Sequence, residues 1–273
     1  MFIILKFIFK TFIVGLLFVY LTIDMQSKNS LFDPETVYIP AGDFSFQMAG
    51  DFRRGNIIVD APIQKIAAKN SFYIMKYHVS QKDYALCVAD LMCENTIKNV
   101  SEDYPQVNVN FLDATKYAYW LSKKTNKVWR LPSEKEWVRA AGNFNNDIMN
   151  SPEIGDIDLS KRWIKKYKEE TFKRGKSDPQ LRKAGYYGEN NLGVADINGN
   201  IWEWTTACFR NGKVSNDGKT LISHSDYCGV RLVKGKHHTF VIDFIRDAKS
   251  GGCAVGTPPD NLGIRLVLDP KEN

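Results

Sequence analysis

The chain has 273 residues, of which 44% are hydrophobic and 25% charged, so it can bury a full core as one large domain or two small ones. Its net charge of +6 is far from the dense basic surface of a nucleic-acid-binding protein, and we expect no nucleic-acid partner.

The apolar character of the first 23 residues indicates that the protein is exported. They are apolar except for Lys6, Lys10 and a few small polar residues, and the uncharged part has the length of a signal-peptide core. The two lysines form the positive flank that keeps an N-terminus cytoplasmic. No small-residue cleavage site and no lipobox cysteine follow, so a cleaved signal peptide and an uncleaved membrane anchor both stay open. Either way we expect a periplasmic or otherwise extracytoplasmic protein in which residues 24–35 are a linker.

Short strands are expected next. Residues 37–46 alternate like a strand that Pro40 and Gly42 break, and residues 70–75 are a second candidate.

Three helices follow in the middle of the chain, each with a capping residue at its start. Ser80, Asn110 and Ser133 suit the N-cap position, and an acidic residue stands three positions after each of them. Apolar residues recur at helical spacing after the first two caps, and Gly142 is a fitting end for the third helix. The sequence therefore predicts helices that begin directly after these three residues.

A basic insertion spans residues 161–183, with ten lysines and arginines against three acidic residues. We expect it to be helical around residues 163–172. It is either a dock for an acidic partner or anionic lipid, or a solvated loop.

Residues 191–204 combine asparagines, glycines, two carboxylates and two tryptophans. Residues 196–199 predict a turn, and residues 201–204 a strand with both indoles on one face and Glu203 on the other. The carboxylates of Asp196 and Glu203, with carbonyls of the turn, could surround a hard cation such as calcium. The alternative is a satisfied turn that carries two core tryptophans, because no EF-hand spacing is present.

The five cysteines fit an exported protein. Cys87 and Cys93 are close in sequence, and Cys208 and Cys228 flank a polar hairpin or long turn at residues 211–218. We therefore predict the disulfides Cys87–Cys93 and Cys208–Cys228, with Cys253 left over. Five free thiols in a reducing compartment are the alternative.

Two further strands are expected at residues 227–233 and 262–268, with mostly loop between them because that interval is rich in glycine and proline. Short strands, irregular segments and helices confined to the middle of the chain predict an α+β fold.

Six motifs occur in the order found in one enzyme family. Residues 130–137 read R-L-P-S-E-K-E-W against R-L-P-T-E-A-E-W, and residues 191–204 match N-x-x-G-L-x-D-M-x-G-N-V-W-E-W. The others are residues 37–44 (P-x-G-x-F), 78–84 (E-V-T-x-x-x-Y), 104–114 (Y-P-V-x-x-V-S-W-x-D-A) and 261–265 (N-x-G-F-R). Across residues 36–269 the chain thus resembles the formylglycine-generating enzyme (sulfatase-modifying factor) family.

This resemblance implies one domain over residues 36–269 with a loop-rich fold related to C-type lectins. It also implies a structural calcium ion, whose ligands would be Asp196, the carbonyls of Gly199 and Ile201, and Glu203.

The resemblance does not extend to the oxidase site. The family's oxidases use two cysteines that bind copper to convert a substrate cysteine to formylglycine, and thiolates suit copper(I). Here no cysteine occurs between residues 229 and 252, so we expect no copper. His237, His238 and Cys253 remain as weak catalytic candidates.

Three functions stay open. The first is an exported binding or assembly protein, with a protein or peptide partner, that keeps the scaffold without the oxidase cysteines. The second is a formylglycine-generating oxidase with an unusual site. The third is other oxidative chemistry around His237 and His238. We rank them in this order, because the loss of the cysteine pair removes the oxidase mechanism while the scaffold residues persist, and fold does not fix function.

Overall fold

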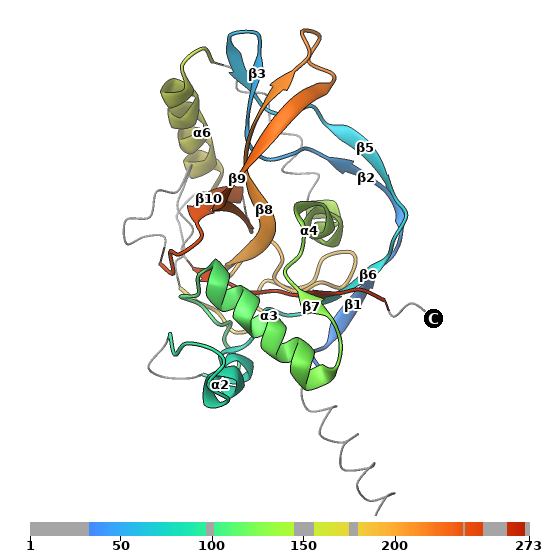
Figure 1. Ribbon diagram of the computed structural model, residues 1–273, viewed down its shortest axis with the longest axis vertical. Helices are drawn as coiled ribbons and strands as arrows, with labels where there is room; N and C mark the ends of the chain where they lie inside the picture. Colours follow the sequence, from blue (N-terminus) through green and yellow to red (C-terminus); the bar gives the residue numbers. More distant parts are fainter. Residues whose placement is uncertain are drawn as a thin grey trace, which may run out of the picture.

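The computed structural model describes residues 33–96, 101–144, 156–174, 180–236, 238–247 and 261–270 (Figure 1). Three sheets and four helices make up this part of the chain, which confirms the α+β class. One sheet has the order β1 (Thr36–Ile39), β6 (Phe72–Met75), β12 (Val267–Leu268) and β7 (Trp129–Arg130). Strands from both ends of the chain thus meet in one sheet.

The largest sheet has the order β10 (His238–Ile242), β9 (Leu221–Lys234), β8 (Trp202–Val214), β3 (Asp51–Arg54) and β4 (Ile57–Val59). β11 (Leu262–Gly263) pairs with the start of β8, in parallel. A separate ribbon pairs β2 (Gly42–Phe46) with β5 (Gln64–Ala68). Figure 1 shows this ribbon curving along the side of the molecule opposite α6 (Leu159–Arg174).

The three predicted helices are present and begin where their caps place them. They are α2 (Gln81–Ala89), α3 (Phe111–Thr125) and α4 (Glu134–Ala141). The side chains of Ser80, Asn110 and Ser133 accept hydrogen bonds from the backbone N–H three residues on. Each such cap stabilises its helix by about 1 kcal/mol.

Two apolar clusters hold the helices and sheets together. One joins α2 and α3 to Trp202, Trp204 and the segment around β11 and β12. The other joins β1, β6 and α4, with Trp137 at 1% exposure, to Val194 and Ile197 of the 191–204 segment. Both indoles of β8 lie in the first cluster, as predicted from the alternation.

The C-terminal third has more strand than the sequence indicated. β10 lies in an interval predicted to be mostly loop, β9 begins six residues before the predicted strand, at Leu221, and β8 continues to Val214. Residues 262–268 form two short strands on either side of Arg265 rather than one. β10 forms by pairing with the adjacent β9 in a short hairpin, in which Thr239 pairs with Val233. β12 forms by pairing with a distant strand, in which Val267 pairs with Ile74.

Both predicted disulfides are present. Cys87–Cys93 closes the end of α2, and Cys208–Cys228 links β8 to β9 with a Cα–Cα distance of 4.6 Å.

The basic insertion contains a helix where one was predicted, and this helix, α6, is attached to the sheet by a buried cation. Arg162 is 1% exposed, and its guanidinium lies 2.7 Å from Asp51 and 2.8 Å from Asp60. Lys161, Lys165 and Lys168 are exposed. The solvated-loop interpretation is therefore wrong for Arg162.

Among the described residues, no helix has the length and apolar character needed to cross a membrane. The predicted export segment, residues 1–23, lies outside those residues.

Candidate functional site

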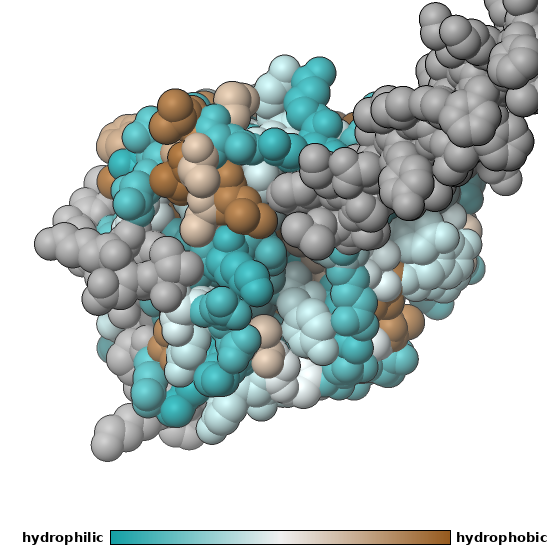
Figure 2. Space-filling view, turned by 90° about the horizontal axis from the view of Figure 1, so that it is seen from below, coloured by the Kyte–Doolittle hydropathy of each residue, from teal (hydrophilic) through white to brown (hydrophobic). Residues whose placement is uncertain are grey.

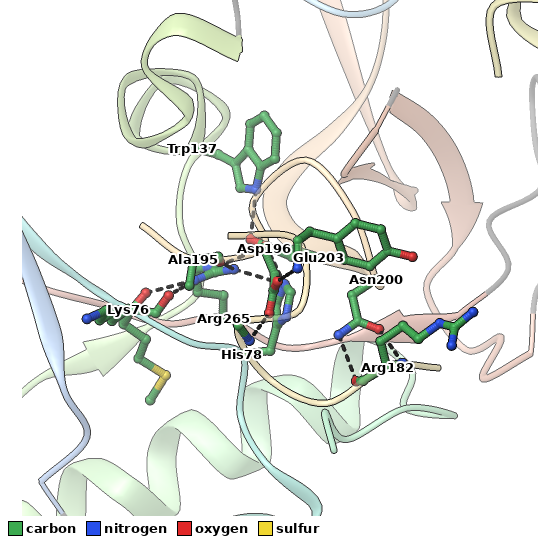
Figure 3. Close-up of polar contacts among 12 residues, drawn as sticks. Lys76, His78, Trp137, Arg182, Ala195, Asp196, Asn200, Glu203 and Arg265 are labelled. Atoms are coloured by element: carbon green, nitrogen blue, oxygen red, sulfur yellow. Dashed lines mark hydrogen bonds and ion pairs between the residues drawn. The ribbon is translucent and has the colours of Figure 1, made fainter. Parts of the chain in front are cut away.

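The turn at residues 196–200 holds a neighbouring loop in place (Figure 3). Asp196 and Asn200 adopt left-handed backbone conformations, with φ of +55° and +67°. The Asp196 carboxylate accepts hydrogen bonds from the backbone N–H groups of Gly185 and Tyr187. The Asn200 amide accepts from the backbone N–H of Arg182 and donates to its carbonyl, both at 2.9 Å. The predicted turn is thus confirmed, and its polar side chains fix residues 182–187.

Glu203, on the next strand, is completely buried with both carboxylate oxygens engaged. Its Oε1 lies 2.9 Å from Arg265 Nε and 2.8 Å from His78 Nε2, and its Oε2 accepts from Trp137 Nε1 at 2.7 Å. Figure 3 shows the three donors converging on the carboxylate from different segments.

The Arg265 guanidinium occupies the position of an internal cation. Besides Glu203, it donates to the carbonyls of Met75, Lys76 and Ala195 at 2.6–2.9 Å. It thereby connects β6, the 191–204 segment and β8 through one buried charge. Its Nη2 also lies 2.9 Å from His78 Nε2. A buried guanidinium is compensated, and stabilises the fold, only while oxygen partners such as these four remain.

The charge states in this cluster follow from its surroundings. Burial alone would raise the pKa of Glu203, but Arg265 and His78 outweigh it and hold that pKa below its usual value. Burial, reinforced by Arg265, lowers the pKa of His78 despite the opposing effect of Glu203. Glu203 is therefore ionised and His78 neutral at pH 7. Nε2 of His78 lies 2.8 Å from the ionised Glu203 oxygen and 2.9 Å from Arg265 Nη2, and one nitrogen cannot both donate and accept. We assign the ring proton to Nε2 because the charge of the carboxylate favours it there, and Arg265 Nη2 then donates to the Ala195 carbonyl.

The predicted calcium ligands do not fit a calcium site in this conformation. The oxygens of Asp196 and Glu203 face N–H donors, and the Gly199 carbonyl accepts from the backbone N–H of Ile201 at 2.8 Å. Calcium would have to displace these donors, and Arg265 would repel it. Calcium binding therefore stays a prediction.

The structure describes one of the three catalytic candidates, His238. His237 and Cys253 lie outside the described residues. His238 is the half-buried first residue of β10, opposite Lys234, with its ring 6.4 Å from that of Phe240. The described residues include no group of three histidines, cysteines or carboxylates near enough to share a metal ion. A catalytic role for these candidates stays a prediction.

Sequence reasoning missed His78 as a member of this cluster. Its signal was present: His78 stands where the family motif E-V-T has glutamate. The contact itself had no local signal, because His78 and Glu203 are 125 residues apart.

The outer part of the β8–β9 hairpin offers a second candidate surface. Residues 222–229 of β9 are exposed, and no described strand pairs with their outer edge because β10 pairs only with residues 230–234. On the hairpin face beside α6, the charged residues that line a cleft of about 330 Å³ are Arg53, Lys213 and Asp51, and Asp51 is paired with Arg162. An open strand edge beside cationic side chains suits an extended acidic segment.

Comparison with protein families gives one match over nearly the whole chain. Residues 23–270 match the family described as sulfatase-modifying factor enzyme 1-like domain.

Curated relatives align over shorter stretches. The formylglycine-generating enzyme of Mycobacterium tuberculosis is 25% identical over 185 residues, which cover 61% of this chain and 58% of that protein. The proteins named inactive C-alpha-formylglycine-generating enzyme 2 from Bos taurus and Mus musculus are each 28% identical over 120 residues, 40% of this chain. That stretch covers 34% of the bovine protein and 33% of the mouse protein. The chain thus spans less than two thirds of the curated relatives it matches.

Solved structures share the fold. PvdO from Pseudomonas aeruginosa superposes with a TM-score of 0.55 at 20% identity, covering 89% of this chain and 97% of that one. Treponema denticola variable protein 1 gives a TM-score of 0.50 at 15% identity, with coverage of 86% and 95%.

Proposed function

The chain belongs to the family of sulfatase-modifying factor enzyme 1-like domains, and from this premise we propose that it is an exported binding or assembly module without formylglycine-generating activity. The disulfide Cys208–Cys228 carries the proposal. With Cys87–Cys93 it occupies four of the chain's five cysteines. Only Cys253 is left to supply a thiolate.

One remaining cysteine cannot supply the two thiolates of a copper site. The family's oxidases hold copper between two cysteines, and copper(I) prefers thiolate to imidazole or carboxylate. Cys208 and Cys228 were the nearest substitutes for the missing pair. Their sulfurs are bonded to each other, and Cys208 is buried, with Arg231 Nη1 3.3 Å from its sulfur.

Two further observations support the proposal. Two of the mammalian relatives are named as inactive, so loss of the oxidase has a precedent among proteins that this chain resembles. The open edge of β9 and its cationic cleft also offer a surface for an extended, acidic protein or peptide partner.

Copper titration and turnover test the proposal directly. The purified chain without its N-terminal 23 residues is mixed with copper(I) and with a Cys-x-Pro-x-Arg peptide under oxygen, beside the Mycobacterium tuberculosis relative as positive control. We expect no stoichiometric copper and no formylglycine product by mass spectrometry. Product that disappears in Cys253→Ser would overturn the proposal in favour of an oxidase. Product that survives in Cys253→Ser and disappears in His238→Ala would favour oxidative chemistry around the histidines.

A further inference from the structure

The cleft on the hairpin face beside α6 has the size of a small-molecule site. Its volume of about 330 Å³ falls in the range of such sites, about 300–1,000 Å³. Residues of β3, β4, β8 and β9 line it, together with Leu159 of α6. Figure 1 shows α6 beside this end of the largest sheet, whereas Figure 2 views the molecule from the end at which α2 lies, where hydrophobic residues gather among hydrophilic ones. The cleft and that mixed surface are therefore separate features.

The alternation of side chains along β3 and β8 decides which of them face the cleft. Phe52 of β3 lies in a buried apolar cluster, and a Cβ atom added at Gly212 of β8 would lie 2.8 Å from its ring. The next residues, Arg53 and Lys213, point to the opposite face of the sheet, and both line the cleft. The strand register makes Arg53 and Lys213 direct neighbours. Like charges at such positions repel each other, so this pair destabilises the sheet unless an anion joins it.

Neither of these two cations has a counter-ion in the part of the chain that the structure describes. Arg53 and Lys213 are exposed, and neither side chain makes a hydrogen bond or ion pair with a described residue. Asp51, the carboxylate of the cleft, is already engaged: it accepts from Arg162 at 2.7 Å and from Trp163 Nε1 at 3.3 Å. The cleft therefore keeps two uncompensated positive charges side by side.

Neutral hydrogen-bonding groups extend the same face. Lys213 pairs in register with Ser223, and Asn211 pairs with Ser225, so two hydroxyls and an amide lie beside the cations. No side-chain hydrogen bond within the described residues occupies these three groups. His224 stands between the two serines, so its ring points to the other face of the sheet and adds no charge here.

This set of groups matches a tetrahedral dianion. An arginine fork binds two oxygens of an oxyanion, and a lysine ammonium and a serine hydroxyl can each bind another. A phosphate monoester carries about −1.5 to −2 charges at pH 7, which two cations balance, whereas a carboxylate or a sulfate ester carries one. The apolar side chains of Ile58 and Leu159 also line the cleft and offer contacts to the carbon part of an ester.

We propose that this cleft binds the phosphate group of a small phosphate monoester. Arg53 and Lys213 hold the phosphate oxygens and balance their charge, Ser223 donates a hydroxyl hydrogen bond, and Leu159 contacts the carbon chain. The site goes beyond the proposed function, because it requires neither a protein partner nor a cysteine, and its test involves no copper. An acidic peptide at the open edge of β9 is the competing occupant, and the test includes one.

Four probes separate the contributions in the full chain. Propyl phosphate, propyl sulfate and butyrate carry the same three-carbon chain on a tetrahedral dianion, a tetrahedral monoanion and a planar monoanion. Tetraglutamate carries several charges without a phosphate. Their affinities are measured by calorimetry at pH 7.5 and constant ionic strength, because screening by salt changes every such interaction.

We expect propyl phosphate to bind roughly tenfold more tightly than the other three probes, as a second charge-assisted contact provides. Arg53→Gln and Lys213→Gln should each weaken it by about the same factor. The matched control is Arg54→Gln, because Arg54 is the next cation on β3 and alternates to the opposite face, and it should leave the affinity unchanged. Arg53 and Lys213 are exposed, so their variants should keep the melting temperature of the unaltered chain.

Four results would overturn the proposal. They are no measurable binding of propyl phosphate, equal binding of the three propyl-chain probes, tighter binding of tetraglutamate, and an equal loss in Arg54→Gln. Tighter binding of tetraglutamate would assign the cleft to an acidic peptide. An equal loss in Arg54→Gln would show attraction by the overall charge of the hairpin instead of a site.

Discussion

The Glu203–Arg265 pair should be the most sensitive point of the fold, and Glu203→Gln tests this. Both side chains are 0% exposed, and two carboxylate oxygens accept from three donors, on Arg265, His78 and Trp137. A glutamine has one acceptor oxygen, so its amide nitrogen must face a donor whichever way it turns. The substitution therefore leaves the Arg265 charge without a counter-ion and one N–H without an acceptor.

The expected loss is large because no solvent screens the pair. Removing one member of a buried ion pair costs about 3–5 kcal/mol, and one unsatisfied buried donor about 1–3 kcal/mol. The two costs partly count the same loss, so we expect the free energy of unfolding to fall by about 4 kcal/mol. Trp137→Phe removes the Oε2 partner and some volume from a buried side chain, and leaves Arg265 and its counter-ion in place. It should cost about 2 kcal/mol from the hydrogen bond to a charged group, plus a cavity cost.

Urea unfolding followed by tryptophan fluorescence measures these values with disulfides intact. The double variant Glu203→Gln/Arg265→Met should be less destabilised than the sum of its single variants, by about 2 kcal/mol, because the second substitution removes the stranded charge. A loss below about 1 kcal/mol for Glu203→Gln, or strict additivity in the cycle, would refute the assignment of Arg265 as the internal cation.

Three further outcomes follow from the structure. Because the pKa of His78 is lowered in the folded chain, the unfolded chain binds the extra proton, so stability should fall as pH drops below 6.5, and His78→Gln should flatten this part of the pH profile. Arg162→Met should destabilise by about 2 kcal/mol and raise proteolysis in α6, whereas the exposed Lys165→Met should change stability by less than about 0.5 kcal/mol; similar effects in both would contradict anchoring by Arg162. If the calcium prediction holds, a chelator lowers the melting temperature of the unaltered chain and not of Glu203→Gln, while no response in either excludes that site.

Local chemistry explains which parts of the fold could be predicted. An N-cap such as Ser80 or Ser133 and the acidic residue three positions later are read from adjacent residues, and the structure places each of those helices accordingly. The disulfide Cys87–Cys93 is likewise a contact between neighbours in the sequence. Such contacts depend on backbone geometry that the residues themselves determine.

Contacts between distant segments could not be read in this way. Glu203 is 62 residues from Arg265 and 125 from His78, and nothing near Glu203 shows that its counter-ion is an arginine rather than a metal. β10 was missed for another reason: it pairs with the neighbouring β9 in a short hairpin, but the interval after residue 234 is rich in glycine and proline, which indicate loop. Arg162 was read as one of many exposed cations because its carboxylate partners lie more than 100 residues earlier.

The contacts of the motif residues also explain why membership of the family predicts the fold of this chain better than its function. The motifs that identify the family contain Asp196, Asn200, Glu203 and Arg265. The polar atoms of each of these side chains form hydrogen bonds with other parts of the same chain. In this chain these residues serve the fold, whether or not the protein is an enzyme. Chemistry particular to this chain must therefore come from positions where it departs from the motifs. His78 is one such position, because this histidine stands where the motif has glutamate, contacts Glu203 through Nε2 and leaves Nδ1 without a partner among the described residues.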